Sequence, residues 1–252
     1  MKYNLNEKIA ERKTKEVYKD GDKTIKLFVP NYSKADILNE ALIQSRVEEG
    51  SNLNIPKLIE VTKIDDRWAL VSEHIEGKTL CEVINENKED RSKYLELFVD
   101  IQLEVLSKNI PLLNRMKDKY RRKLTDSNLL DENTKYELLQ RLEGMKNHTK
   151  LCHGDFNPTN VIIKEDESYA VIDWSHATQG NASSDAANTY LEFNLCGSCN
   201  VADEYLSIFS RKSGIEKENI QKWIPIVAAI LLEKHPENKE KLEKYINVVD
   251  FD

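Results

Sequence analysis

The stretch CHGDFNPTNVIIKEDESYAVIDWSH, residues 152–176, decides the fold and carries most of the functional information in this chain. Asp155 and Asn160 lie in it in the pattern H-x-D-x-x-x-x-N. Two β-prone runs follow before Asp173, and they predict a hairpin that ends at this aspartate. These runs are Val161–Ile163 and Tyr169–Ile172. One loop and one strand end are therefore expected to converge.

Carboxylate and carboxamide side chains at this spacing suit phosphoryl transfer. Moving a γ-phosphoryl group needs a carboxylate that orients and deprotonates the attacking hydroxyl, and Mg²⁺ that neutralises charge on the phosphates. Asp155 suits the first role. Mg²⁺ prefers oxygen ligands and usually takes only one or two from the protein, so Asn160 and Asp173 form a half-site that nucleotide oxygens and water would complete.

At these residues the sequence resembles the aminoglycoside phosphotransferase family, bacterial small-molecule kinases that share the protein-kinase fold. The HGD triplet replaces the HRD of protein kinases, and Asp173-Trp174 stands where they have DFG. Asp185 matches a second aspartate that follows in the family. The resemblance implies that His153 positions the loop and that Asp185 braces it through backbone amides. Asp185 could also cap the helix that begins there.

The first part of the chain predicts a small antiparallel sheet with one helix. The triplet Asp20-Gly21-Asp22 is a strong hairpin signal, and Ser33–Glu49 predicts a helix that Ser33 can cap. The β-prone runs are Glu16–Lys19, Thr24–Val29, Leu58–Lys63 and Trp68–Ser72.

Lys26 lies in the second of these runs. Strand alternation points its side chain to the face opposite Ile25 and Leu27, and we expect that face to be the nucleotide side. The family resemblance implies that Lys26 contacts the α and β phosphates while Glu40, on the helix, holds the lysine in place. A surface salt bridge is the alternative for either residue.

The segment 72–78 resembles the family hinge, where backbone groups bind the adenine edge. The resemblance implies that Glu73 and Ile75 contribute through their C=O and N–H groups. The first hairpin departs from the family pattern, because residues 9–15, IAERKTK, contain no glycine where glycine usually lets backbone amides approach the phosphates. The side chains of Lys13, Thr14 and Lys15 could cover the phosphates instead, or the loop could be mobile and nucleotide affinity modest.

From residue 79 onward the pattern is mainly helical. We therefore expect an α+β, bilobal, protein-kinase-like fold, with a nucleotide-binding lobe at 1–75, a catalytic and substrate-binding helical lobe at 76–252, and the active site between them. The basic stretch 117–123 is predicted to be a solvated helix face rather than a nucleic-acid patch. The helix-prone runs are Arg91–Leu106, Asp131–Lys146, Ser184–Phe193, Ala202–Lys212, Asn219–Lys234 and Glu237–Val248.

The charge and the apolar runs of the chain limit the kinds of partner that we expect. With 37 basic and 44 acidic residues among 252, the net charge of −7 argues against a nucleic-acid partner and is compatible with a cationic substrate. The N-terminus lacks an apolar signal region, and the longest apolar run, 223–232, is too short to cross a bilayer. We expect a cytoplasmic monomer that does not contact membranes.

The sequence thus predicts an ATP- or GTP-dependent, Mg²⁺-dependent kinase that phosphorylates a small-molecule hydroxyl, with aminoglycosides as the first substrate class. Glu192, Asp203 and Glu204 follow the catalytic segment and could bind a cationic acceptor. The alternative is a metabolic kinase for choline, ethanolamine, a sugar or a nucleoside-like compound. A nucleotide-binding pseudokinase is a weaker alternative, and a protein kinase is disfavoured because no A-P-E-like motif follows Asp173.

Overall fold

A computed structural model describes residues 2–196 and 199–247. The described residues form two compact units. The part of the 152–176 stretch from Pro158 to His176 belongs to the same unit as the N-terminal strands. The hinge predicted near residue 75 stays a prediction. The first unit comprises the described residues up to Asn87 together with Pro158–His176, and the second comprises Lys88–Asn157 and the described residues from Ala177 onward.

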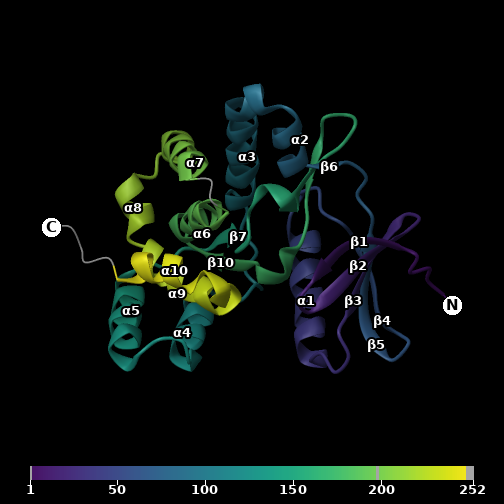
Figure 1. The fold of residues 1–252 in the computed structure, drawn as a ribbon, viewed down its shortest axis with the longest axis horizontal. Coiled ribbons are helices and arrows are strands. Elements are labelled where there is room, and N and C mark those ends of the chain that lie inside the picture. The colour runs from purple at the N-terminus through teal and green to yellow at the C-terminus, as the bar shows by residue number, and fades with distance from the viewer. Residues whose placement is uncertain (1, 197–198, 248–252) are drawn as a thin grey trace. The chain divides into compact units, whose positions relative to one another are not determined.

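A five-stranded antiparallel sheet forms the centre of the first unit, in the order β1-β2-β3-β5-β4 (Figure 1). Asp20 pairs with Lys23 across a two-residue turn, which confirms the hairpin predicted there. Gly21 has a φ of 58° in this turn, a conformation that glycine adopts without steric cost. The strands are β1 Glu7–Arg12, β2 Lys15–Asp20, β3 Lys23–Phe28, β4 Leu58–Ile64 and β5 Arg67–Glu73.

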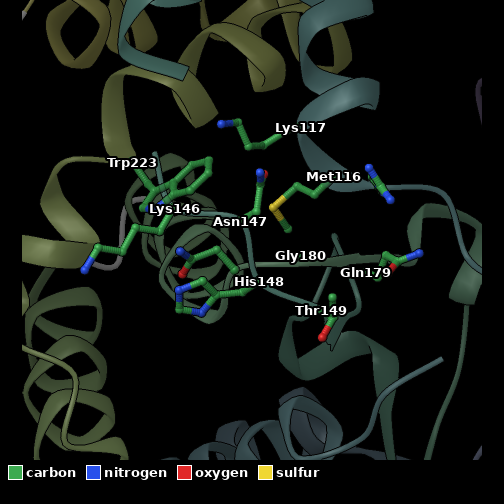
Figure 2. Close-up of a pocket in the computed structure, with 11 residues that line it drawn as sticks. Met116, Lys117, Lys146, Asn147, His148, Thr149, Gln179, Gly180 and Trp223 are labelled. Atoms are coloured by element: carbon green, nitrogen blue, oxygen red, sulfur yellow. The ribbon is translucent and has the colours of Figure 1, made fainter. Parts of the chain in front are cut away.

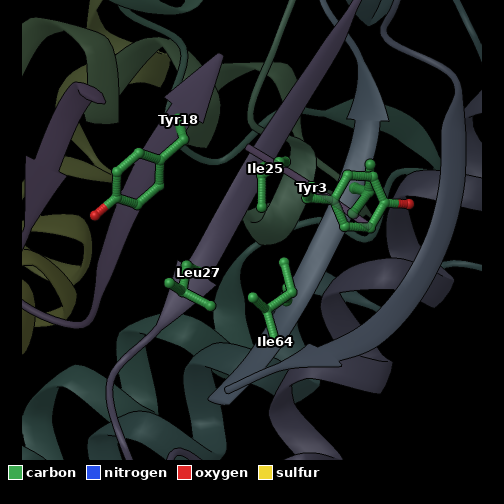
Figure 3. Packing of buried hydrophobic residues seen from close by; sticks show 7 residues of the cluster. Tyr3, Tyr18, Ile25, Leu27 and Ile64 are labelled. Atoms are coloured by element: carbon green, nitrogen blue, oxygen red, sulfur yellow. The ribbon is translucent and has the colours of Figure 1, made fainter. Parts of the chain in front are cut away.

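The two faces of this sheet bury different clusters. Tyr18, Ile25 and Leu27 contribute to one face, together with Tyr3 from the N-terminal segment and Ile64 from β4 (Figure 3). Because neighbouring residues of a strand point to opposite faces, the residues next to Ile25 and Leu27 belong to the other face.

Helix α1, Lys34–Gly50, covers that second face. Its Ile37 and Ala41 pack with Phe28 of β3 and Leu70 of β5. The helix begins at the predicted cap, because the Ser33 hydroxyl accepts a hydrogen bond of 3.3 Å from the Asp36 N–H. Lys26, one residue from Ile25 and from Leu27, therefore lies on the face of the sheet that α1 covers.

A second, three-stranded sheet completes the first unit, in the order β6-β8-β9. The predicted hairpin before Asp173 is its main part, and Val161 pairs with Val171. Helix α2, Leu80–Glu86, begins with Thr79 and Glu82 in a reciprocal capping box. The strands are β6 Lys78–Thr79, β8 Val161–Ile163 and β9 Tyr169–Val171.

The second unit is mainly helical, as the sequence predicts. A two-stranded sheet of β7, Lys150–Cys152, and β10, Thr178–Gly180, accompanies its helices. Phe98 and Phe156 stack with ring centroids 4.7 Å apart in its core. The helices are α3 Arg91–Leu106, α4 Met116–Asp126, α5 Glu132–Gly144, α6 Ala182–Leu195, α7 Cys199–Ser213, α8 Lys217–Gln221, α9 Ile224–Lys234 and α10 Lys239–Ile246.

The prediction of one continuous helix over 219–234 is wrong. The structure has two helices there, and Pro225 stands in the first turn of the second. Proline has no backbone N–H to donate and fixes φ near the helical value, so it is tolerated at a helix start and breaks a helix interior. The predicted end of the last helix, Val248, lies outside the described residues. Within the described ranges, no helix is both long enough and apolar enough to span a membrane.

Candidate active site

Lys26, Glu40 and Asp173 form an ion-pair network in the first unit. The Lys26 Nζ lies 2.9 Å from Glu40 Oε1 and 2.7 Å from Asp173 Oδ1. β3 supplies the lysine, the middle of α1 supplies the glutamate, and the loop after β9 supplies the aspartate. Burial alone would lower the pKa of Lys26, but the two carboxylates outweigh it and raise the pKa. Lys26 is therefore a fixed positive charge.

The backbone at Asp173 is held in an uncommon conformation. Its φ is 62°, in the left-handed region that aspartate tolerates better than most residues. The neighbouring Ile172 N–H donates to the Asn160 C=O at 2.9 Å, and the buried Trp174 indole donates to the Val171 C=O at 2.8 Å. These bonds fix the direction in which the aspartate side chain leaves the chain.

Asp173 is ionised throughout the usual pH range. Burial by itself would raise its pKa, but the charges of Lys26 and Lys15 outweigh burial and hold the pKa far below its ordinary value. The backbone bond from Ile172 to Asn160 joins the two segments that carry Asp173 and Asn160, and a carboxylate and a carboxamide supply the oxygen ligands that Mg²⁺ prefers. Within the described ranges, no group of three or more histidine, cysteine, aspartate or glutamate side chains could hold a metal.

Lys15, one of three residues of the first hairpin whose side chains the sequence suggested could cover the phosphates, is also a member of this network. Its Nζ lies 3.4 Å from Glu40 Oε1 and 3.6 Å from Asp173 Oδ1, the two oxygen atoms that Lys26 contacts. Lys15 begins β2, and its cross-strand partner is Phe28, two residues after Lys26. The alternation that placed Lys26 could have placed Lys15 on the same face, once the register of the β2–β3 hairpin was fixed.

The predicted hinge residues follow β5. Glu73 ends this strand, and its N–H donates to the Lys57 C=O at 2.9 Å, while the His74 N–H donates to the Asp22 C=O at 2.8 Å. Ile75 is half-buried. The backbone of the segment is thus anchored on both sides, and its role toward a nucleotide base stays a prediction.

Asp155 belongs to the second unit, where its carboxylate contacts Lys234, a residue far along the chain. The Lys234 Nζ, at the end of α9, lies 2.8 Å from Asp155 Oδ1 and 2.8 Å from Glu192 Oε1. His235 approaches the same glutamate, with Nε2 3.4 Å from Oε1. Burial would raise the pKa of Glu192, but the hydrogen bond from His235 and the charge of Lys234 outweigh it and lower the pKa to about 2.

Asp185 braces the loop before Asp155. Its Oδ1 accepts a hydrogen bond of 2.8 Å from the Gly154 N–H, and its Oδ2 accepts one of 3.2 Å from Gln102 Nε2. The side chain of Asp185 is buried at the start of α6, and burial raises its pKa. His153 is also buried and packs edge-on against Phe156, with centroids 5.8 Å apart. Both residues lie where they can support the loop.

Asp203 and Glu204, the other two residues predicted to bind the acceptor substrate, contact other residues of the second unit. Glu204 on α7 accepts hydrogen bonds from Ser92 and from Arg91, the latter at 3.2 Å. Asp203 lies 3.5 Å from the Tyr190 hydroxyl. Of the three predicted carboxylates, Glu192 shares a partner with Asp155 in these contacts.

The basic stretch 117–123 is only partly solvated, contrary to the prediction. Burial, together with the charges of Lys123 and Arg122, lowers the pKa of Lys119 to about 7. Tyr120 is buried as well and receives a hydrogen bond of 3.3 Å from the Ser184 hydroxyl. The 3.6-residue repeat of α4 places Met116, Tyr120 and Leu124 on its buried face and leaves Lys119 and Lys123 half-buried, which a count of charges along the chain does not reveal.

The second unit contains a pocket of about 280 Å³ (Figure 2). Met116, Gly180, Trp223, Lys146 and His148 are among the residues that line it. None of the predicted site residues lines it.

The sequence model of the phosphotransferase enzyme family matches residues 26–216, which is more than half of the chain. No curated protein matches the sequence. Among solved structures, the apo form of a thermostable mutant of the aminoglycoside phosphotransferase APH(4)-Ia is similar, with a TM-score of 0.69 at 14% identity. That alignment covers 94% of this chain and 90% of the other.

Two further structures have bound ligands. A ternary complex of an APH(4)-Ia mutant with AMP-PNP and hygromycin B has a TM-score of 0.68 at 12% identity and covers 94% of this chain and 89% of the other. The GDP complex of an aminoglycoside 2′-phosphotransferase-IIIa mutant has a TM-score of 0.63 at 14% identity, with coverage of 96% and 92%. The predicted fold class, an antiparallel N-terminal sheet followed by a helical remainder in a kinase-like fold, is confirmed.

Proposed function

The chain belongs to the phosphotransferase enzyme family, and on that premise we propose that it transfers the γ-phosphoryl group of ATP or GTP to a hydroxyl of a small molecule, with Mg²⁺. The observation that carries the proposal is the network of Lys26, Glu40 and Asp173. It presents a fixed ammonium and an ionised carboxylate side by side, as a site for metal-bound phosphates requires.

Each side chain has a distinct part in this proposal. Lys26 binds phosphate oxygens while Glu40 keeps its ammonium in place, and Glu73 and Ile75 bind the base through their backbone groups. Asn160 and Asp173 would hold Mg²⁺, which supplies neutralisation of charge on the phosphates when it is bound.

Asp155 takes the proton from the acceptor hydroxyl onto a carboxylate oxygen. The contact with the Lys234 ammonium at 2.8 Å holds one oxygen of this carboxylate in place. His153 and Asp185 keep the loop in position, and Asp185 does so through the Gly154 N–H.

For the acceptor we propose an aminoglycoside-type, cationic compound. Asp155 and Glu192 hold one ammonium group, that of Lys234, at 2.8 Å from each carboxylate. An amino group of an acceptor offers the same charge and the same N–H donors, so it could replace the lysine there. Hygromycin B, which the similar ternary complex contains, is a suitable first compound to test. Choline and ethanolamine also carry a cation and serve as comparison acceptors.

The test measures nucleotide binding and transfer in the same preparation. The melting temperature should rise with MgATP or MgGTP, because ligands that bind the native state stabilise it by mass action. Transfer of labelled γ-phosphate is then assayed with hygromycin B, choline and ethanolamine. Asp155→Asn should lower turnover about 100- to 10,000-fold while nucleotide binding persists.

The matched control is Asp166→Asn, which makes the same change on an exposed turn and should leave transfer unchanged. Wild-type turnover by Asp155→Asn would rule out this aspartate as the base. If neither nucleotide shifts the melting temperature and no acceptor is labelled, the proposed function is wrong.

A further inference from the structure

Lys15 lies almost buried at the start of β2, with a side chain that is 13% exposed. In the β2–β3 pair, Lys15 lies opposite Phe28 and Val17 lies opposite Lys26. Lys15 and Lys26 are therefore diagonal neighbours on one face of the hairpin. Diagonal neighbours in an antiparallel pair are about 7–8 Å apart at the backbone, within reach of long side chains. Both ammonium groups therefore reach the same oxygen atoms of Glu40 and Asp173.

The two lysines contact these oxygens unequally. Lys26 lies at 2.7 and 2.9 Å from them, whereas Lys15 lies at 3.4 and 3.6 Å. Taking a second ammonium out of water costs free energy that such long contacts offset only in part. A divalent cation on Asp173 would compete with both lysines for one oxygen. Lys26 would keep its contact of 2.9 Å to Glu40, whereas Lys15 would keep only its longer contact of 3.4 Å to the same oxygen.

The turn that precedes Lys15 shows how the first hairpin forms without a glycine. Arg12 pairs directly with Lys15, so Lys13 and Thr14 form a two-residue turn. Neither has a positive φ, the conformation that would demand glycine. The Val29 N–H donates to the Thr14 C=O at 3.0 Å, which ties the turn to the end of β3. Lys15, the first residue after this turn, is thereby placed on the same face of the sheet as Lys26.

We propose that Lys15 is a nucleotide-binding residue whose ammonium contacts a phosphate oxygen, in the role that backbone amides of a glycine-containing turn would otherwise fill. The inference rests on the proposed function, since it requires a nucleotide at Lys26. A charged side chain supplies a strong, charge-assisted hydrogen bond to phosphate and needs no close approach of the backbone. Affinity for the phosphates, rather than for the base, is the property that Lys15 controls.

The test compares Lys15→Met with Lys8→Met by calorimetric titration with MgATP and with adenosine. Methionine keeps the unbranched stem and removes the charge. Lys8 also pairs with two carboxylates, Glu11 and Glu16, but its ammonium lies over the ring of Tyr18, on the opposite face of the sheet. Lys15→Met should weaken MgATP binding about tenfold to hundredfold, and both variants should bind adenosine as the wild type does. Lys15→Arg should restore most of the MgATP affinity.

Melting temperatures without nucleotide show whether each variant is folded. Lys15→Gln, which also removes the charge, carries the test if Lys15→Met does not fold. Wild-type MgATP affinity in Lys15→Met, or an equal loss in Lys8→Met, overturns the role of Lys15. So does an equal loss of MgATP and adenosine binding. Lys26→Met separates this inference from the proposed function: if it abolishes MgATP binding while Lys15→Met does not alter it, only the inference fails. A wild-type protein that binds no MgATP overturns both.

Discussion

Two lysines that share two carboxylates should behave as a redundant pair in the free protein. We predict that Lys15→Met and Lys26→Met each reduce the free energy of unfolding modestly, and that the double variant loses more than the sum. The reason is that either ammonium, left alone, still lies within 3.6 Å of Glu40 and Asp173. With both removed, the buried carboxylate of Glu40 and the half-buried carboxylate of Asp173 are left without either ammonium.

The magnitude follows from the distances. At an effective dielectric constant of about 20, unit charges 2.8 Å apart attract by about 6 kcal/mol, and those 3.5 Å apart by about 5 kcal/mol. Lys15 therefore retains most of the attraction when Lys26 is lost, and each single substitution should cost about 1 kcal/mol. Stripping a buried ion pair of one partner costs about 3–5 kcal/mol, which is the expected loss in the double variant. The excess over the sum is then about 1–3 kcal/mol.

The assay is urea unfolding of the four proteins in a double-mutant cycle at pH 7 without nucleotide. Unfolding at low pH provides an internal control, because the pKa of Asp173 is depressed in the folded protein. The stability that the ionised Asp173 contributes is present above the pKa of aspartate in the unfolded chain, near 4, and is lost as the pH falls below that value. The deficit of the double variant should therefore shrink below about pH 4. Additive losses at pH 7, or a deficit that does not change with pH, would refute the shared network.

Glu192→Gln should cost up to about 3 kcal/mol near pH 5.5, because the pKa of about 2 lies well below the unfolded value of 4.5. Urea unfolding should find a smaller deficit at pH 3.5, where the unfolded glutamate is protonated, and a smaller one well above pH 7, because Glu192 raises the pKa of His235 and this stabilisation is lost as His235 deprotonates. A deficit that does not change with pH would contradict the linkage. Asp173→Ala should lose the Mg²⁺-dependent part of the melting-temperature rise with ATP, and a retained Mg²⁺ effect would exclude this residue as a metal ligand. Gly77→Ala should cost about 3 kcal/mol or more, because φ is 145° and a Cβ there would lie 2.3 Å from the Ile163 carbonyl oxygen, whereas Gly144→Ala, with nothing within 4 Å, should not destabilise; equal melting temperatures for the two would be the contrary result.

Local patterns in the sequence were sufficient for most of the elements. Alternation over 24–29, the Asp20-Gly21-Asp22 turn and the capping serine at position 33 depend on neighbours a few residues away, so they can be read along the chain. Only one long element was misjudged, at 219–234. The signal was present there, since Pro225 marks a helix start, but helical periodicity outweighed it in the prediction.

The motif at 152–176 and its family resemblance determined which residues are candidates for the chemistry, but not which residues they contact. Lys26 and Asp173 are 147 positions apart, and Lys234 and Asp155 are 79 apart. No periodicity relates such positions, because their meeting depends on how whole elements pack and in which register strands pair. The sequence by itself therefore determined the fold class and the candidate catalytic residues. Only the tertiary structure decided that Lys15 joins Lys26, that Lys234 pairs with Asp155, and that Glu204 is bound to Arg91 and Ser92.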